Sequence, residues 1–184
     1  MSEKKSPIEF RTKGIIVDSG IKIIEQSSID ALSTRGYGKT EEKVFTLTFF
    51  EALYLQEKEM LEVKDPKGEI INFQSLLQYF ESMNENAWTN YLVYRDLRNR
   101  GYVVREGFGN KSDFRIYERG NYGKEVAPYL ILSMQEGKPL PINDLSMSLE
   151  QCKSQKKELI LAVMNRRGEI VHYSVSELVF SKIE

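Results

Sequence analysis

The stretch from residue 91 to residue 120 constrains the fold of this chain more than any other part of its sequence. It reads YLVYRDLRNRGYVVREGFGNKSDFRIYERG. Apolar residues at helical spacing lead up to Gly101, and glycine is the usual residue where a helix stops in a left-handed conformation. The residues that follow predict a strand over about 102–106, a glycine-containing turn, and a second strand over about 113–118. We therefore expect a helix followed by two neighbouring strands.

The rest of the second half predicts more strands and one more helix. Strands are expected over about 129–134 and 169–175, and a helix over about 143–155. Between them, LILAVM at residues 159–164 is a continuous apolar run, which is typical of a strand buried on both faces. Together these elements predict a domain over residues 87–184 with a mixed central sheet flanked by helices.

The first half predicts a smaller α/β domain over residues 1–82. Apolar residues at helical spacing indicate helices over about 48–58 and 73–82, and an alternating run at 61–63 indicates a strand. The polar run from Ser82 to Asn86 is the expected linker between the domains. The expected fold class is therefore α/β (α+β) with two domains. Nothing in the first half has the spacing of a metal site, a phosphate loop or a nucleophile elbow.

Composition excludes several classes of protein. Hydrophobic residues at 41% and aromatic residues at 11% favour packed cores over disorder. The one cysteine, Cys152, leaves no internal disulfide and indicates a reducing compartment, so we expect a cytoplasmic protein. No apolar run approaches the roughly 20 residues needed to span a membrane, so no membrane partner is expected. The net charge of −1 gives no overall attraction for nucleic acid, so RNA contacts would need a local patch or a partner.

Several short motifs follow one another along the chain in a distinctive order and spacing. They are Gly36-Tyr37-Gly38-Lys39, Glu51-Ala52-Leu53-Tyr54-Leu55, residues 91–101, Gly107, Asp113-Phe114, Tyr117, Ala127-Pro128-Tyr129-Leu130 and Lys157-Glu158-Leu159-Ile160-Leu161-Ala162. In this order the motifs closely resemble those of archaeal tRNA-intron (tRNA-splicing) endonucleases. The resemblance covers about residues 29–180. It implies the N-terminal and the catalytic-like C-terminal domain of that family, with no metal and no cofactor.

The resemblance also implies a reaction and the residues that carry it. In the family, the ribose 2′-hydroxyl attacks the adjacent phosphate, which leaves a 2′,3′-cyclic phosphate and a free 5′-hydroxyl. A tyrosine near the 2′-hydroxyl, a histidine that protonates the leaving oxygen and a lysine that stabilises the phosphorane suit this chemistry. The tyrosine corresponds to Tyr117 and the lysine to Lys157. The histidine position is occupied by Val126, which cannot donate a proton.

Two further departures concern the same pocket. The family commonly has an arginine seven residues before its lysine, which clamps flipped-out bases by stacking, and this position is Glu150 here. The glycine-rich turn also differs from the family's, which favours a Lys-Tyr-Gly-Ala-like run, whereas this chain has Gly109-Asn110-Lys111-Ser112. We therefore expect Tyr117, Val126 and Lys157 to be remnant positions of an incomplete catalytic site. The structural alternatives are a tyrosine that caps the core and a solvated lysine beside a buried strand.

Other residues are candidates for supporting roles. Arg95 and Arg98 are candidate RNA contacts, with a solvated helix end as the alternative. Glu125 is a conceivable replacement for the missing acid, but it would have to be protonated near neutral pH, and a solvent-facing carboxylate is the expectation. The chain's one histidine, His172, lies far off in the last strand and is expected to be structural.

The departures make the chain resemble the structural, non-catalytic subunit of heteromeric members of the family. The resemblance then implies a catalytic endonuclease chain as partner, in a heterotetramer with two copies of each chain, and precursor tRNA as substrate. Family members pair the final strand and tail of two subunits. We accordingly expect an interface that includes Val171, Tyr173, Val175 and Phe180, with a tail folded onto its own domain as the alternative.

The long loop between the strand ending near Met134 and the helix beginning near Asn143 is a second candidate contact. The resemblance implies that this loop corresponds to an acidic loop of the family, which enters a basic groove of a neighbouring subunit like a plug. Glu136 is the expected plug residue, while Asp144 better fits a helix N-terminus. An ordinary solvated loop is the alternative.

Two other functions stay open alongside the structural subunit. The chain could be an active endoribonuclease that uses Tyr117 and Lys157 with an unorthodox acid. It could also be a binding module unrelated to splicing, because a fold alone does not imply a function.

Overall fold

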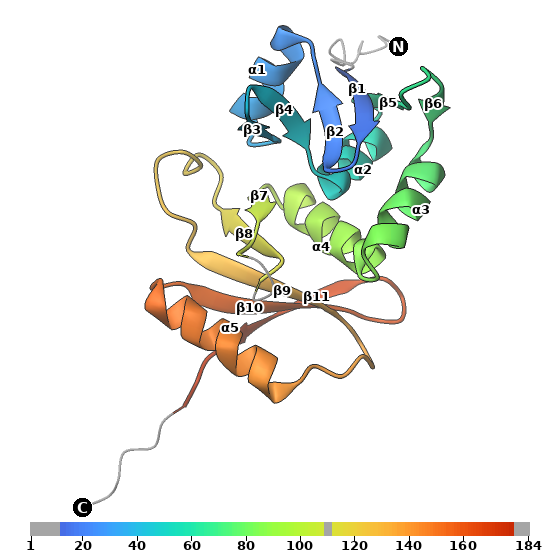
Figure 1. Ribbon diagram of the computed structural model, residues 1–184. Coiled ribbons are helices and arrows are strands. Elements are labelled where there is room, and N and C mark those ends of the chain that lie inside the picture. Colours follow the sequence, from blue (N-terminus) through green and yellow to red (C-terminus); the bar gives the residue numbers. More distant parts are fainter. Residues whose placement is uncertain (1–11, 109–111, 179–184) are drawn as a thin grey trace, which may run out of the picture. The chain divides into compact units, whose positions relative to one another are not determined.

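The computed structural model describes residues 12–108 and 112–178, and these residues form two compact units (Figure 1). The division falls between Tyr91 and Leu92, within helix α4 (Ala87–Asn99). Helix α3 (Phe73–Met83) ends just before this helix, so the predicted linker at 82–86 corresponds to the short connection between two helices. A domain boundary at that connection stays a prediction.

The first unit contains a six-stranded mixed sheet in the order β3-β4-β2-β1-β5-β6. Its central strand β1 pairs antiparallel with β2 and parallel with β5, and the other neighbours are antiparallel. Of its strands, only the one at 61–63 was expected from the sequence. The strands of this sheet are Thr12–Val17 (β1), Gly20–Ile23 (β2), Lys39–Glu41 (β3), Val44–Leu47 (β4), Leu61–Lys64 (β5) and Ile70–Ile71 (β6).

A buried carboxylate holds the glycine motif of this unit against helix α2 (Phe49–Glu57). Glu51 accepts hydrogen bonds from the N–H of Thr48 at 2.9 Å and from the N–H of Gly38 at 3.1 Å. Thr48 in turn accepts from the N–H of Glu51, which completes a capping box at the start of the helix. Gly38 has φ +66°, and a Cβ there would lie 2.2 Å from the ring of Phe45. Glycine is therefore required for this close approach.

The helices of the first unit bury its apolar residues against one another. The rings of Phe49 and Phe80 stack 5.3 Å apart, which joins α2 to α3. Both helices were predicted from apolar periodicity, and both predictions are confirmed. Helix α1 (Gln26–Thr34) leads to the glycine motif.

The second unit contains a five-stranded mixed sheet in the order β11-β10-β9-β8-β7. Strands β9 and β10 are parallel, and all other neighbours are antiparallel. All five strands were predicted from the sequence and are confirmed. They are Val103–Glu106 (β7), Phe114–Tyr117 (β8), Tyr129–Gln135 (β9), Glu158–Met164 (β10) and Ile170–Val175 (β11).

Each face of the second sheet packs against a helix. Helix α5 (Ile142–Ser154) covers one face, where Cys152 is buried with Leu130 and Leu159 (Figure 1). The part of α4 that belongs to this unit covers the other face, where Tyr94 packs against Phe114 with ring centroids 6.0 Å apart. The predicted α/β (α+β) class, with a mixed sheet flanked by helices in the C-terminal domain, is confirmed.

Candidate functional site

The register of the second sheet brings the three remnant positions to one end of it. Strand β8 runs antiparallel to β9 with Ile116 opposite Tyr129, so the end of β8 lies beside the segment that enters β9. Strand β10 runs parallel to β9 with Glu158 opposite Tyr129, so β10 begins at the same end. The positions gathered there are Tyr117, Val126 and Lys157.

Lys157 is held in place by the end of helix α5 and by the chain next to β9. Its N–H donates to the carbonyl of Cys152 at 2.8 Å, directly after Lys156 takes a left-handed φ of +54°. Its side-chain Nζ donates to the backbone carbonyl of Ala127. Partial burial, and secondarily the charge of Arg115, lower the pKa of Lys157 below the ordinary lysine value. Lys157 is therefore a fixed, half-buried cation and not a freely solvated charge.

Tyr117 is half-buried and forms part of an aromatic and cationic cluster. Its ring meets the ring of Tyr122 nearly edge-on, at 5.2 Å and 82°. The guanidinium of Arg105 lies 5.9 Å from the centre of the Tyr122 ring. The structural alternative, a tyrosine whose ring packs at a strand end, accounts for these contacts. They also leave Tyr117 at the same end of the sheet as Lys157.

Val126, which the resemblance aligns with the family's histidine, has 78% of its surface exposed, whereas the next residue, Ala127, is buried. An isopropyl side chain at an open position supplies neither a proton nor a hydrogen bond. Its neighbour Glu125 is exposed and accepts a hydrogen bond from the side-chain amide of Asn121 at 2.6 Å. Glu125 therefore lies on the surface, as the solvent-facing expectation had it.

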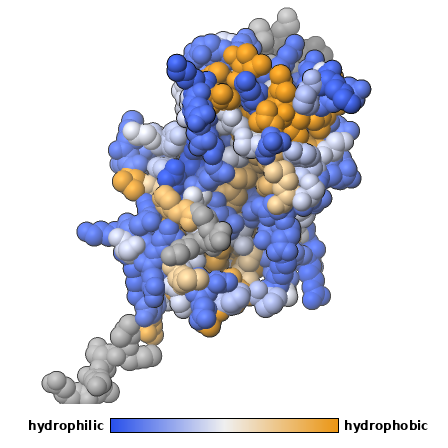
Figure 2. Space-filling model, in the orientation of Figure 1, coloured by the Kyte–Doolittle hydropathy of each residue, from blue (hydrophilic) through white to orange (hydrophobic). Residues whose placement is uncertain are grey.

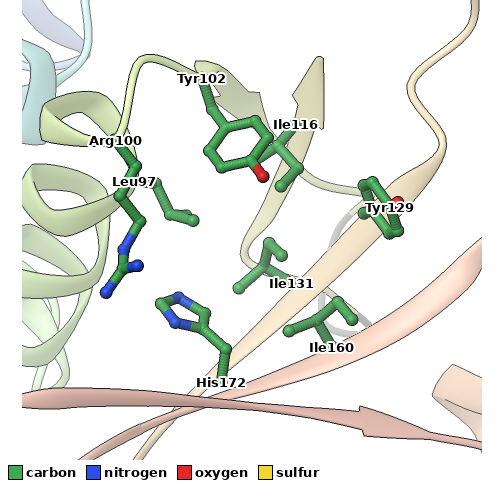
Figure 3. Close-up of a pocket in the computed structure, with 8 residues that line it drawn as sticks. All are labelled: Leu97, Arg100, Tyr102, Ile116, Tyr129, Ile131, Ile160 and His172. Atoms are coloured by element: carbon green, nitrogen blue, oxygen red, sulfur yellow. The ribbon is translucent and has the colours of Figure 1, made fainter. Parts of the chain in front are cut away.

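The chain's one histidine lies on the opposite face of the sheet from Tyr117. His172 lines a cavity of about 220 Å³ together with Ile116 and Tyr129 (Figure 3). Side chains alternate between the two faces along a strand, so Tyr117 points away from the face that Ile116 occupies. His172 Nε2 lies 3.8 Å from an oxygen of Asp96, which pairs with Arg100 at 2.7 Å. Burial, as the largest effect, lowers the pKa of His172. It cannot serve as the acid beside Tyr117.

Arg115 is the residue at this site that sequence reasoning missed. It lies two residues before Tyr117 on β8, so both side chains leave the same face. Its guanidinium lies 5.1 Å from the centre of the Phe108 ring, and its Nε is buried without a hydrogen-bond partner. The alternation of arginine and tyrosine in the run FRIY was the signal that could have identified it.

The site therefore combines a tyrosine and a lysine at one end of a mixed sheet. The family described as tRNA intron endonuclease, N-terminal domain, matches residues 14–77, and tRNA intron endonuclease, catalytic C-terminal domain, matches residues 87–173. A tRNA-splicing endonuclease of Methanococcus vannielii is 35% identical over 161 residues, which cover 88% of this chain and 91% of the relative. The chain belongs to the tRNA intron endonuclease family.

Two further relatives extend this family assignment over nearly the whole chain. A tRNA-splicing endonuclease of Methanococcus maripaludis is 34% identical over 88% of this chain and 91% of its own length. One of Pyrococcus horikoshii is 31% identical over 96% of this chain and 99% of its own length. Both domains of a tRNA intron endonuclease are therefore present in one chain.

The arginines near the end of α4 have structural partners in this family member. Arg98 donates to the carbonyl of Tyr102 at 3.4 Å, and both Arg95 and Arg98 are half-buried. These features agree with the alternative in which the arginines belong to the helix end and do not contact RNA. Glu150, at the clamp position, is exposed on α5. A role for any of them in RNA binding stays a prediction.

The expected interface residues of β11 differ in exposure. Val171 and Tyr173 are 42% and 54% exposed, and β11 is an edge strand of the described sheet. Val175 instead packs against the core under α5. Figure 2 shows that much of the visible surface is hydrophilic, with apolar residues gathered in limited areas. Phe180 and the altered turn at 109–111 lie outside the described residues.

Glu136 is exposed in the loop after β9. Its N–H donates to the carbonyl of Met164 at 2.8 Å, and its carboxylate accepts from the N–H of Arg166 at 3.3 Å. The loop is thus anchored to the β10–β11 turn. Asp144 lies in the first turn of α5, as its sequence position predicted. In the part of the chain that the structure describes, no helix is long and apolar enough to cross a membrane, and no cluster of metal-binding side chains occurs.

Proposed function

We propose that this chain is the structural subunit of a tRNA-splicing endonuclease that excises introns from precursor tRNA, without a competent active site of its own. The observation that carries this proposal is the exposed Val126 at the acid position, combined with the placement of the one histidine on the other face of the sheet. The 5′-oxygen that leaves during cleavage needs a proton, and valine cannot supply one.

The expected loss of activity is large. General acid catalysis typically contributes about 10²–10⁴-fold to a rate. Tyr117 and Lys157 could still orient the 2′-hydroxyl and stabilise charge on the phosphorane, but these effects do not protonate a poor leaving group. Glu150 adds to the defect, because a carboxylate neither stacks on a base as a cation nor attracts a phosphate.

A chain without chemistry can still be essential to cleavage. We infer a partner of the same family that carries the histidine, in a heterotetramer with two copies of each chain that acts on precursor tRNA in the cytoplasm. The structural chain would hold the two cleaving sites at the spacing of the two intron ends. Such positioning has a large effect, since a misplacement of about 1 Å can cost 10²-fold in rate. The exposed Val171 and Tyr173 on an edge strand support a contact with this partner.

A second candidate function is favoured by one observation. Lys157 has a lowered pKa, so it is a better proton donor at neutral pH than an ordinary lysine. It could act as the unorthodox acid of an active endoribonuclease. In that case the purified chain cleaves precursor tRNA alone, and Lys157→Ala abolishes the cleavage.

The test is a cleavage assay of the purified full chain with an intron-containing precursor tRNA. We expect no 2′,3′-cyclic phosphate product above that of a Tyr117→Phe/Lys157→Ala double variant. Efficient cleavage by the chain alone, lost in that double variant, would contradict the structural role and support the active enzyme. A chain that is inactive and also fails to assemble with or activate a histidine-bearing family member would favour a binding module unrelated to splicing.

A further inference from the structure

Arg115 has features of an anion-binding residue that the described part of the chain does not satisfy. Among the described residues it forms no ion pair, and its Nε is buried without a hydrogen-bond partner. The register of β7 and β8 pairs Arg115 with Arg105 on the neighbouring strand. Lys157 is close enough for the charge of Arg115 to lower its pKa. Positively charged side chains therefore gather at this end of the sheet, and such a cluster attracts an anion.

Phe108 holds the guanidinium of Arg115 and still leaves part of its own ring open. The guanidinium lies 5.1 Å from the ring centre, and 38% of Phe108 is exposed. The backbone around Phe108 is fixed, because its N–H donates to Ser112 Oγ at 3.1 Å and the N–H of Gly107 donates to the carbonyl of Asp113 at 2.8 Å. A Cβ at Gly107 would lie 2.1 Å from the carbonyl oxygen of Ser112, so this position requires glycine. The arginine and its aromatic support are therefore preorganised.

The chemistry of this pair selects a particular anion. A planar guanidinium donates two parallel hydrogen bonds to a phosphate, which a lysine ammonium cannot do. An exposed aromatic ring beside it offers a stacking surface to an unpaired base. A single-stranded or bulged RNA supplies both groups from neighbouring nucleotides, whereas duplex RNA keeps its bases stacked inside the helix. A carboxylate-rich peptide supplies only the charge.

We propose that Arg115, supported by Phe108, binds a backbone phosphate of an unpaired RNA segment beside the remnant site of this chain. The proposal rests on the proposed function for the identity of RNA as ligand, and it adds a binding residue that the tyrosine, histidine and lysine of the family do not include. Its consequence is a site that retains RNA without cutting it. In a complex with a catalytic partner, this chain would then contact RNA directly and not only space the two active sites.

The experiment measures binding of a labelled bulged RNA by fluorescence anisotropy, with 2′-deoxy substitution at the bulge so that cleavage cannot occur. The full chain is compared with Arg115→Ala, Arg115→Lys and Phe108→Ala. The matched control is Arg167→Ala, which removes one positive charge from the exposed turn after β10. Poly-glutamate of equal charge serves as competitor. Thermal unfolding of each variant establishes that it is folded, and Arg115→Lys retains the charge if Arg115→Ala does not fold.

We expect Arg115→Ala to weaken RNA binding about tenfold or more and to reduce the slope of log K against log salt by about one. Arg115→Lys should keep the salt slope but lose part of the affinity, because the fork and the stacking are gone. Phe108→Ala should lose affinity mainly for bulged RNA and little for duplex. An Arg115→Ala affinity equal to that of Arg167→Ala, or displacement of the RNA by poly-glutamate, would overturn the proposal. This binding assay uses a non-cleavable RNA and no partner chain, so its result does not depend on whether the chain cleaves. Cleavage of precursor tRNA by the chain alone would refute the proposed structural role but would leave the proposed RNA contact of Arg115 standing.

Discussion

The side-chain Nζ of Lys157 donates a hydrogen bond to the backbone carbonyl of Ala127, the residue directly after Val126. This contact ties the start of β10 to the segment that leads into β9. It therefore fixes Lys157 next to Val126, the residue that the resemblance aligns with the family's histidine. If that alignment holds, the surroundings of the acid position are kept while valine replaces the acid.

Replacing Val126 with histidine tests whether the missing acid is the main defect. Val126 is exposed, so the larger ring meets no packed neighbours, and an imidazole titrates near neutral pH. We expect Val126→His to raise cleavage of precursor tRNA by the isolated chain on the order of tenfold or more. The gain should fall short of the full 10²–10⁴-fold of an acid because Glu150 remains at the clamp position.

The control for this gain is Val126→Gln, which is polar and of similar size to histidine but has no titratable proton. Product formation should follow a rise and fall with pH only in the histidine variant. Equal rates for both variants would show that the acid position is not what limits the chain.

His172 predicts how the stability of the fold responds to acid. Its folded pKa lies below the ordinary value because burial disfavours the imidazolium. The unfolded chain therefore binds a proton at a higher pH than the folded chain does, and stability is lost as the pH falls from about 6.5 through the folded pKa. We expect the free energy of unfolding in urea to fall from pH 7 to pH 5 more steeply in the wild type than in His172→Gln. Parallel pH dependences of the two proteins would contradict this assignment.

Tyr173 tests the proposed contact through β11. It is 54% exposed on an edge strand, so Tyr173→Glu should leave the fold intact and place a charge in an interface that would otherwise bury an aromatic ring. We expect the variant to lose co-elution with a catalytic partner in gel filtration while its melting temperature changes by only a few degrees. Met83→Glu changes a similarly exposed apolar residue in the first unit and should not affect co-elution. Intact assembly of Tyr173→Glu would remove β11 from the interface.

Glu136→Lys tests the plug proposed for the loop after β9. The carboxylate accepts only a weak 3.3 Å bond from Arg166 in its own chain, so charge reversal should have little effect on the isolated chain's stability. We expect weaker tetramer assembly by sedimentation at low salt, and a wild-type assembly that loosens as salt rises, because screening shortens the reach of charge. Unchanged assembly of the variant at low salt would assign the contact to another residue.

The two halves of the chain differ in how much of the fold could be predicted from sequence. The second sheet was predicted strand by strand because β10 is a continuous apolar run and because Gly101 and the glycine-containing turn after β7 mark where the neighbouring elements end. Strands β1 to β4 and β6 were not predicted, since they are short. Their sheet depends on pairing between segments far apart in the sequence, such as the parallel pairing of β1 with β5. Local patterns do not carry that information.

The candidate site was predictable in its main positions but not in its contacts. The resemblance to the family assigned Tyr117, Val126 and Lys157, and the sheet register brings them to one end of the sheet. The hydrogen bond from Lys157 to Ala127 and the stacking of Arg115 on Phe108 were missed. Both depend on which face of a strand a residue occupies and on how neighbouring strands align, which only the three-dimensional register determines.

The most direct test of the structural role is cleavage by a reconstituted complex in which the two kinds of site are disabled separately. The chain is mixed with a histidine-bearing homologue, and the rate of precursor tRNA cleavage is measured with Tyr117→Phe/Lys157→Ala in this chain, or with the partner's histidine replaced. We predict that the double variant retains nearly the full rate, while loss of the partner's histidine abolishes cleavage. A complex that loses cleavage through the double variant, with assembly and RNA binding intact, would show that this chain performs chemistry.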